Sequence, residues 1–259
     1  MKSSEIKKIG KKAILGNRKE AIFIDLFPVI LCLMMTAIIY GIIVLSQKLS
    51  SSAVGSTNEI IIFAVTAVIL GLLSLLTLGA YSSTSVGKKA WYNGLISSKE
   101  NYTRRFFFWF KPKASRRALC LKLLLNVLKL SEAVFFSLPG IMIFITIFYL
   151  AQTGGIELYL FYSLFAGALL LTLCGLSFAF VAAQRYFLAE YIFSSKPKIT
   201  AALAIKQSKN LLDGHIMEIV RFKLSFFPWF LVCLLIFPTI YFVPYYKASC
   251  SLVAKRIVL

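Results

Sequence analysis

The chain has one histidine, His215, in the stretch NLLDGHIMEIV at residues 210–220. Histidine serves as a general acid or base beside a nucleophile or carboxylate, and as a metal ligand when other ligands recur nearby. No Ser or Cys nucleophile stands near His215 in the sequence, and no second histidine forms an HxH or HxxxH pair. The residue directly follows Gly214, a typical helix stop. We therefore interpret His215 as a structural residue at the start of a helix.

Cysteines and short motifs give no stronger indication of chemistry. The five cysteines lie singly in apolar stretches, without a CxxC pair, at Cys32, Cys120, Cys174, Cys233 and Cys250. Small buried hydrophobic side chains explain this pattern. No GxxxxGK[ST], GxGxxG, HExxH or GxSxG pattern occurs in a suitable setting. The sequence predicts no catalytic residues, no bound metal, no cofactor and no enzymatic activity.

Charged residues in long apolar runs are the remaining candidates, because a charge at membrane depth is costly and usually serves a function. Asp25 and Lys223 fall in the first turns of their runs, from which they can reach the interface. Lys129 and Glu132 are three residues apart and predict a pair on one helix face. Lys247 falls near the middle of the last apolar segment and is the candidate intramembrane polar site. The sequence leaves two alternatives. Either Lys247 has an interior role, lining a polar path or pairing inside a helix bundle, or it reaches the interface from a short or tilted helix.

Residues 104–117, RRFFFWFKPKASRR, combine clustered cations with five aromatic residues. Such blocks can bind single-stranded nucleic acid, but this one lies between runs that predict membrane helices. In that setting the aromatic rings settle among lipid headgroups and the cations meet anionic lipid. The predicted anionic-lipid contacts are Arg104, Arg105, Lys111, Lys113, Arg116 and Arg117. A docking surface for another protein is the remaining alternative, and we expect no nucleic acid.

The composition indicates a membrane protein. Of the 259 residues, 59% are hydrophobic and 15% are charged, whereas soluble domains carry about 25% charged residues. At about 1.5 Å per residue, four apolar runs can cross about 30 Å of hydrocarbon. These runs are residues 21–45, 60–81, 133–150 and 158–183. The predicted fold class is all-α, a polytopic bundle of membrane helices forming a single integral membrane domain over residues 1–259.

The last apolar region, residues 224–246, contains three prolines and divides in two ways. A single span there gives five membrane helices. A hairpin of spans at about 216–236 and 239–258 gives six. Because proline interrupts the helical hydrogen-bond ladder, Pro238 suits the turn of such a hairpin. We favour six helices arranged in three hairpins.

The distribution of cations predicts the orientation, since cytoplasmic loops carry an excess of Lys and Arg. Residues 1–20, 82–131 and 184–223 contain seven, eleven and seven of these residues, whereas 46–59 and 151–157 contain one and none. The N-terminus is therefore predicted to be cytoplasmic. With six helices the C-terminus is cytoplasmic as well.

The cytoplasmic segments, residues 82–131 and 184–215, are not plain loops. Ser3 or Ser4 caps a predicted amphipathic helix at residues 4–15. A second amphipathic helix is predicted over residues 199–213, with Thr200 as its cap and Gly214 as its stop. Its apolar stripe consists of Ala201, Ala204, Ile205, Ser208, Leu211 and Leu212. We expect both helices to lie in the membrane interface.

The chain also contains a weak internal repeat. Aligning Gly16 with Gly214 pairs Glu20 with Glu218 and places a proline a few residues into each following apolar run. We interpret the chain as three units, each an amphipathic helix followed by a membrane hairpin. The small residues of FAGALLLTLCGLS, residues 165–177, predict close helix packing.

Several stretches resemble a family of bacterial, mostly Gram-positive, polytopic membrane proteins known only as a domain of unknown function. These stretches are SSEIKKIGKKAILGN, SLPGI, RYFLAEYIFSSKPKITAALAIKQSKNLLDGH and VPYYKAS. The family is similar in layout to the membrane domain attached to some glycerophosphodiester phosphodiesterases. The resemblance implies six membrane helices and no established activity. The stretch IFPTI before the last span departs from the family pattern, which tends to have glycines there.

Together these features predict a multi-pass protein of the bacterial cell membrane with a non-enzymatic role. Its expected partners are the lipid bilayer, anionic headgroups of the cytoplasmic leaflet and another membrane protein to which it is accessory. The alternative is a transporter or permease subunit with a polar path near Lys247.

Overall fold

The computed structural model describes residues 3–52, 57–97, 102–154, 157–196, 198–233 and 236–258. Every regular element in these ranges is helical. In chain order the elements are α1 (Ser3–Leu15), α2 (Arg18–Ser52), α3 (Thr57–Ile96), α4 (Tyr102–Phe108), α5 (Pro112–Gln152), α6 (Leu158–Ala183), the 3-10 helix η1 (Gln184–Tyr186), α7 (Ala189–Ser195), α8 (Ala201–Leu212), α9 (Ile216–Leu224), α10 (Phe227–Val232) and α11 (Ile236–Val258).

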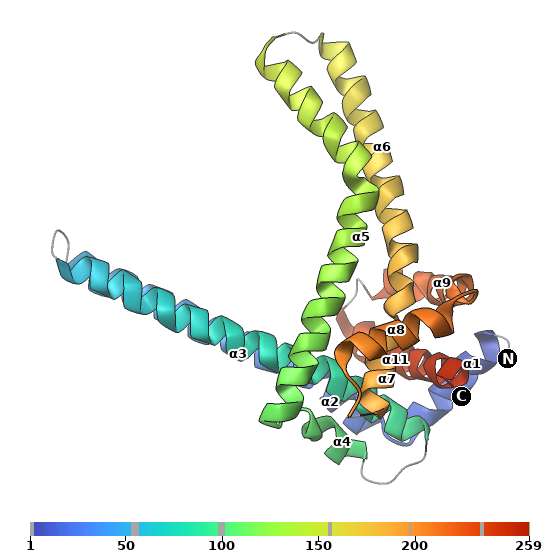
Figure 1. Ribbon diagram of the computed structural model, residues 1–259. Helices are drawn as coiled ribbons and strands as arrows, with labels where there is room; N and C mark the ends of the chain where they lie inside the picture. Colours follow the sequence, from blue (N-terminus) through green and yellow to red (C-terminus); the bar gives the residue numbers. More distant parts are fainter. Residues whose placement is uncertain are drawn as a thin grey trace.

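Two long helical hairpins project from a body of shorter helices (Figure 1). α2 pairs with α3 in one hairpin, and α5 pairs with α6 in the other. The hairpins leave the body in different directions, so their tips lie far apart. The two chain termini lie near each other on the body.

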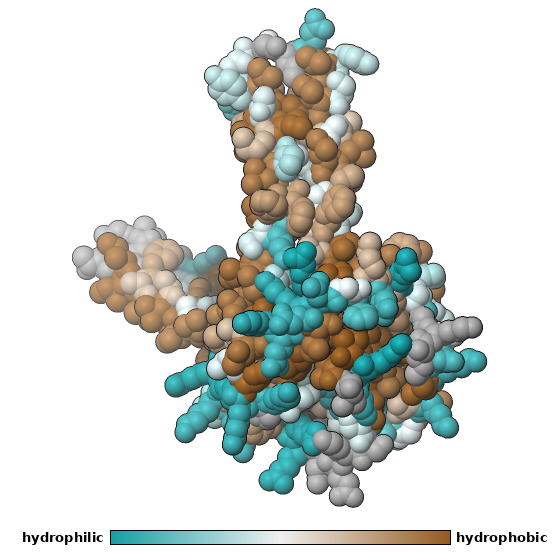
Figure 2. Space-filling view, turned by 45° about the vertical axis from the view of Figure 1, so that its right-hand side comes forward, coloured by the Kyte–Doolittle hydropathy of each residue, from teal (hydrophilic) through white to brown (hydrophobic). Residues whose placement is uncertain are grey.

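Within the ranges that the structure describes, four helices are long and apolar enough to cross a membrane. They are α2, α3, α5 and the run from α6 through η1 into α7. No residue is buried in the most apolar stretch of α2 or of α3, and only 17% of residues are buried in the corresponding stretches of the other two. Figure 2 shows apolar side chains along both hairpins, with hydrophilic side chains concentrated on the body. Because apolar surfaces of this extent need a nonpolar environment, these helices suggest a membrane protein.

The structure supports four of the six predicted spans. The described residues 216–233 form two short helices, α9 with nine residues and α10 with six, whereas about 20 residues are needed to cross the hydrocarbon. The proline Pro228 lies in the first turn of α10, where the chain restarts a helix. α11 has 23 residues and carries three cations, Lys247, Lys255 and Arg256. In the described residues the third repeat unit is therefore not a hairpin of two long apolar helices.

The long helices also build the body. α2, α3 and α5 contain 35, 40 and 41 residues, about twice the number needed to cross a membrane. In α5 a stripe at helical spacing, before the membrane run, is buried against the body and consists of Ala114, Ala118, Leu121 and Leu125. Each long helix thus changes along its length from a membrane-type surface to a core-facing one.

Helices form at both segments that were predicted to be amphipathic, as α1 and α8, and both pack onto the body. α8 begins after Thr200, whose hydroxyl accepts a hydrogen bond from the Leu203 amide at 3.4 Å, and Gly214 follows its end with a φ of 80°. The predicted cap and stop are therefore confirmed. Four of the six residues in the predicted stripe of α8 are buried in the protein, namely Ala204, Ile205, Ser208 and Leu212, whereas Leu211 is exposed. The sequence could not distinguish this contact from one with lipid.

α1 packs on α11 through a close helix contact. Ile6 and Ile14 of α1 are buried. Between them lies Gly10, where an added Cβ atom would fall 2.5 Å from the hydroxyl oxygen of Ser249. A glycine at this position lets the first and last helices approach closely.

Candidate functional site

One stretch of α3, residues 82–93, carries many of the polar contacts of the body. Its sequence is SSTSVGKKAWYN, directly after the apolar run. Asn93 donates hydrogen bonds to the hydroxyls of Ser194 and Ser195 in α7, each at 3.2 Å. The Asn93 carbonyl oxygen accepts a hydrogen bond from Ser251 of α11 at 2.6 Å. α3 is therefore the helix that joins α7 to α11.

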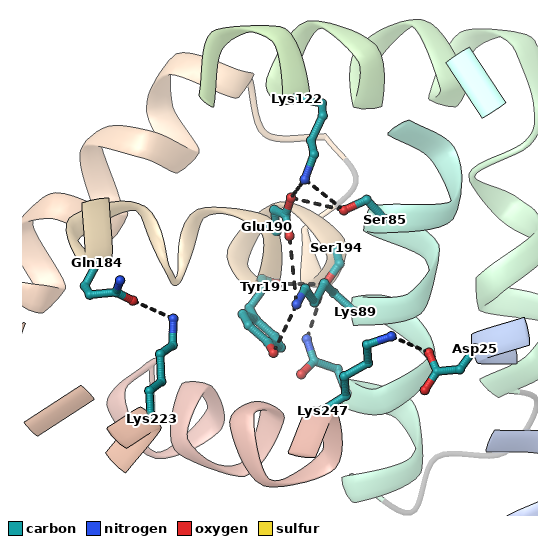
Figure 3. Close-up of polar contacts among 11 residues, drawn as sticks. Asp25, Ser85, Lys89, Lys122, Gln184, Glu190, Tyr191, Ser194, Lys223 and Lys247 are labelled. Atoms are coloured by element: carbon teal, nitrogen blue, oxygen red, sulfur yellow. Dashed lines mark hydrogen bonds and ion pairs between the residues drawn. The ribbon is translucent and has the colours of Figure 1, made fainter. Parts of the chain in front are cut away.

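Asp25 of α2 forms the first charged cluster. Its Oδ1 atom lies 2.5 Å from the Nζ of Lys247 and 3.3 Å from the Nζ of Lys88. The Tyr92 hydroxyl donates to Oδ2 at 2.7 Å. The Lys247 contact is drawn in Figure 3. The sequence predicted an interfacial position for Asp25, but the side chain is only 7% exposed and links α2, α3 and α11 inside the body.

Glu190 of α7 forms the second charged cluster (Figure 3). Its Oε1 atom lies 2.7 Å from the Nζ of Lys122 and accepts a hydrogen bond from the Ser85 hydroxyl at 3.2 Å. Lys89 is a looser partner, with its Nζ 3.9 Å from Oε2. The Lys89 ammonium also lies 4.8 Å from the ring centroid of Tyr191. Lys122 is thus the main counter-ion of Glu190.

A cavity of about 390 Å³ adjoins both clusters and has walls from α3, α5, α6, η1, α7, α9 and α11. This volume lies within the range of small-molecule sites, about 300–1,000 Å³. Its charged lining consists of Lys89, Lys129, Lys223, Lys247 and Glu190. We call this space the lysine cavity. Four lysines and one glutamate therefore line it.

Two of the four lysines have an acidic partner. Lys247 shares Asp25 with Lys88. Lys89 shares Glu190 with Lys122, and Lys122 is the closer of the two. Each of these carboxylates therefore neutralises its cavity lysine only in part.

The other two lysines, Lys129 and Lys223, have no carboxylate within 4 Å among the described residues, although Glu190 attracts both of them from a greater distance. Lys223 donates to the side-chain carbonyl oxygen of Gln184 at 2.5 Å and lies 4.5 Å from the ring centroid of Phe187, and both of these groups are neutral. Lys129 forms no hydrogen bond or ion pair with the part of the chain that the structure describes. Burial lowers the pKa of Lys223 to about 8, and the charges of Lys89 and Lys129 act in the same direction.

The chemistry of this arrangement is that of an anion site. Neighbouring ammonium groups repel one another, and the neutral acceptor of Lys223 offsets only part of the cost of burying that lysine. An oxyanion placed between Lys129 and Lys223 would accept charge-assisted hydrogen bonds, which are about twice as strong as neutral ones. Cys250 also lines the cavity, and burial raises the pKa of its thiol, which disfavours the reactive thiolate.

The predicted lipid contacts lie elsewhere, on α4 and at the start of α5. Five of them are exposed, namely Arg104, Arg105, Lys111, Lys113 and Arg116. The sixth, Arg117, is partly buried, because its guanidinium donates to the carbonyl oxygen of Ile199 and lies 5.7 Å from the ring centroid of Phe193. Two of the block's five aromatic residues, Phe106 and Trp109, are buried in the protein core. Those two rings stabilise the fold and do not reach lipid headgroups.

His215 precedes α9 and stands apart from the lysine cavity lining. Its Nδ1 atom lies 3.5 Å from Oε1 of Glu218, and both side chains are more than half exposed. Within the described ranges, no group of three or more His, Cys, Asp or Glu side chains is placed to hold a metal ion.

One family model matches almost the whole chain, over residues 1–257, and is described as "Protein of unknown function (DUF975)". The chain belongs to the DUF975 family. No curated protein and no solved structure matches it. The family description gives no activity, so the function of this DUF975 protein has to be argued from the lysine cavity and the membrane helices.

The sequence had singled out Lys247, Lys129 and Lys223 separately as charges near membrane runs. It did not predict that they meet, and it missed Lys89 and Glu190 entirely. The signal that could have found Lys89 is the adjacent lysine pair in KKAWYN, which continues the α3 helix beyond its apolar run. The isolated Glu190 gives no comparable signal.

Proposed function

We propose that this DUF975 protein is a multi-pass protein of the cell membrane whose body binds an anionic ligand in the lysine cavity, without catalysing a reaction. The observation that carries the proposal is the charge of the cavity, four lysines facing one glutamate. Two of the lysines, Lys129 and Lys223, have no acidic partner among the described residues. A ligand that supplies negative charge would relieve their mutual repulsion.

We further propose that the membrane is crossed four times and that the body lies on the cytoplasmic side. Two hairpins return the chain to the side on which it starts, so both termini share that side. The cation-rich segments 1–20, 82–131 and 184–223 then all face the cytoplasm, as does the cation-bearing α11. This orientation agrees with the rule that cytoplasmic segments carry the excess of Lys and Arg.

Reporters fused after residues 50, 155, 238 and 259 test this topology. Four crossings place positions 50 and 155 outside and positions 238 and 259 in the cytoplasm. The six-helix arrangement predicted from the sequence differs at one position, because it places residue 238 outside. An external signal at 238 would therefore restore the third hairpin, and an external signal at 259 would contradict both arrangements.

The exposed basic residues of α4 and α5 support a second, weaker contact with anionic lipid headgroups. Exposed cations near a membrane surface contribute about 1 kcal/mol each at most, and salt screens them. We propose Arg104, Arg105 and Arg116 as such contacts and leave out Arg117, whose guanidinium is bonded inside the protein. Neutralising these three arginines should reduce the amount of anionic lipid that copurifies at low salt. An unchanged amount would refute the contact.

The transporter alternative required a polar path near Lys247. The pairing of Lys247 with Asp25 supports a structural role instead, because a neutralised pair in the body needs no ligand to satisfy it. We accordingly propose ligand binding in an accessory or membrane-organising role, with a membrane protein as partner and no nucleic acid.

Binding to the lysine cavity can be measured as an increase in the thermal unfolding midpoint, because a ligand that binds only the folded state raises this midpoint. The purified full chain is heated with inorganic phosphate, glycerol phosphate or an anionic phospholipid, at constant ionic strength. At least one of these anions should stabilise the wild type and not the Lys129→Gln/Lys223→Gln variant. The Lys8→Gln/Lys12→Gln variant loses the same charge from exposed positions and should respond as the wild type does. If no anion stabilises the wild type more than chloride does, the proposed function is wrong.

A further inference from the structure

We propose that the ligand of the lysine cavity is a lipid phosphomonoester, whose phosphate enters from the cytoplasmic leaflet between the body ends of α5 and α6. This inference rests on the proposed function and adds the class of ligand and its route. Three features of the cavity support it: its position relative to the ends of the apolar helices, the exposure of one wall and its charge.

In the proposed topology the cavity lies at the level of lipid headgroups. One wall contains Phe180 and Ala183, the last turn of the apolar helix α6. The same wall contains Lys129, which precedes the apolar run of α5 at 133–150 by four residues. Both helices leave the hydrocarbon at this point, where lipid phosphates also lie.

The wall made by α5 and α6 is exposed. Phe180 is 48% exposed, and Lys129 is exposed as well. The neighbouring outward side chains are apolar, with Leu176 on α6 and Leu130 on α5 both largely exposed. In a membrane these apolar residues contact acyl chains, so a lipid can place its chains along the helices and its headgroup in the cavity. A soluble anion would gain nothing from this apolar approach.

The charge of the cavity matches a phosphomonoester. Lys129 and Lys223 provide two ammonium groups without an acidic partner in the described residues, and a phosphomonoester carries about −1.5 to −2 charges at neutral pH. A phosphodiester headgroup carries one charge and would leave one ammonium unmatched. Glu190 faces the same cavity and disfavours ligands that bring more negative charge than the two lysines can neutralise.

Native mass spectrometry of the purified full chain tests this inference. The protein is incubated with phosphatidic acid, phosphatidylglycerol or phosphatidylcholine, and separately with inorganic phosphate or glycerol phosphate. We expect phosphatidic acid to bind at least about tenfold more tightly than phosphatidylglycerol, and phosphatidylcholine not to bind in the cavity. The Lys129→Gln/Lys223→Gln variant should lose the preference for phosphatidic acid. The matched Lys8→Gln/Lys12→Gln variant should keep it.

The arms of this experiment separate the two proposals. If the soluble phosphates bind and phosphatidic acid does not, the lipid inference fails while anion binding stands. Equal binding of phosphatidic acid and phosphatidylglycerol refutes the preference for a phosphomonoester. If no anion binds, both proposals fail.

A conservative variant guards against misfolding of the glutamine variant. Lys129→Arg/Lys223→Arg keeps both charges and should retain phosphatidic acid within about threefold of the wild type. Loss of binding in this variant as well as in the glutamine variant, with both eluting as the wild type does in size-exclusion chromatography, would contradict a role for the two charges.

Discussion

The Nζ atom of Lys247 lies 2.5 Å from Oδ1 of Asp25, although the two residues are 222 positions apart in the chain. Asp25 belongs to the first membrane helix and Lys247 to the last helix of the body. Lys88 of α3 shares the same carboxylate oxygen at 3.3 Å. This contact therefore joins the two ends of the chain to the α2–α3 hairpin. It also explains a lysine within an otherwise apolar stretch without a transport path.

Replacing Asp25 with Asn should destabilise the protein strongly. The substitution leaves Lys88 and Lys247 without a counter-ion, and breaking a buried ion pair costs about 3–5 kcal/mol. Because the Lys247 side chain is 25% exposed, solvent offsets part of this, and we expect on the order of 2–3 kcal/mol. The thermal unfolding midpoint of the purified protein measures the effect. Asp213→Asn, which removes an exposed carboxylate after α8, should change little.

A second experiment on the same pair distinguishes a structural role of Lys247 from a role in transport. Lys247→Leu should lower the unfolding midpoint, and adding Asp25→Leu should recover part of the loss, since replacing both partners with apolar side chains is often neutral. A stable Lys247→Leu variant that had lost only function would instead support the permease interpretation.

The sequence predicted those parts of the fold that follow local rules. Hydropathy located the apolar parts of α2, α3, α5 and α6, because a helix that crosses a membrane needs about 20 consecutive apolar residues. Thr200 and Gly214 fixed the ends of α8, because capping is decided within a few residues. Hydropathy could not decide the arrangement of residues 216–258, because aromatic residues that pack in the protein core, such as Phe226 and Phe242, are as apolar as those of a membrane span.

The lysine cavity could not be predicted for a different reason. Its charged lining comes from α3, α5, α7, α9 and α11, so the residues meet only after tertiary folding. Taken alone, Lys129 and Lys223 are ordinary cations at helix ends near a membrane. Their lack of an acidic partner is a property of the packed body, and no local pattern encodes it.

Gly175 should be essential for pairing α5 with α6. A Cβ atom there would lie 2.2 Å from the carbonyl oxygen of Phe136, so the backbones must separate to accept a side chain. Overpacking of this kind costs about 1–3 kcal/mol, and Gly175→Leu should lower the unfolding midpoint accordingly. Gly167 lies on the same helix, where no described atom falls within 4 Å of an added Cβ. Gly167→Leu is the matched control, and equal losses in both variants would contradict close packing at Gly175.

Replacing Glu190 with Gln should tighten anion binding while weakening the fold. The variant removes the one carboxylate that lines the lysine cavity, so the cavity becomes more positive and phosphatidic acid should bind about three- to tenfold more tightly. Lys122, whose side chain is 15% exposed, loses its counter-ion, so the unfolding midpoint of the ligand-free protein should fall. Native mass spectrometry and thermal unfolding measure the two effects.

Glu157→Gln provides the matched control for that variant. Glu157 is exposed at the start of α6, at the far end of the hairpin from the lysine cavity. The substitution changes the net charge equally and should leave both measurements unchanged. If it tightened binding as much as Glu190→Gln does, the effect would come from overall charge.

Anion binding should weaken as the pH rises through about 8. Burial lowers the pKa of Lys223 from its usual 10.5 to about 8, so its ammonium is mostly present at neutral pH and is lost at higher pH. A phosphomonoester has its second pKa near 6 and remains dianionic over this range, so the change comes from the protein. Because a charged hydrogen bond contributes about 1.5–3 kcal/mol, affinity for phosphatidic acid should fall about tenfold between about pH 7.5 and about pH 9.

The stability of the ligand-free protein should change with pH in the opposite direction to the affinity. The pKa of Lys223 is lower in the folded protein than in the unfolded chain, so between about pH 8 and 10.5 the unfolded chain binds more protons. The free energy of unfolding without ligand should therefore rise as the pH increases over this range. In the Lys223→Arg variant the guanidinium stays charged throughout, and the affinity should be nearly constant over the same range. A wild-type affinity that does not change with pH, or a Lys223→Arg affinity that falls as steeply as in the wild type, would show that Lys223 does not hold the anion.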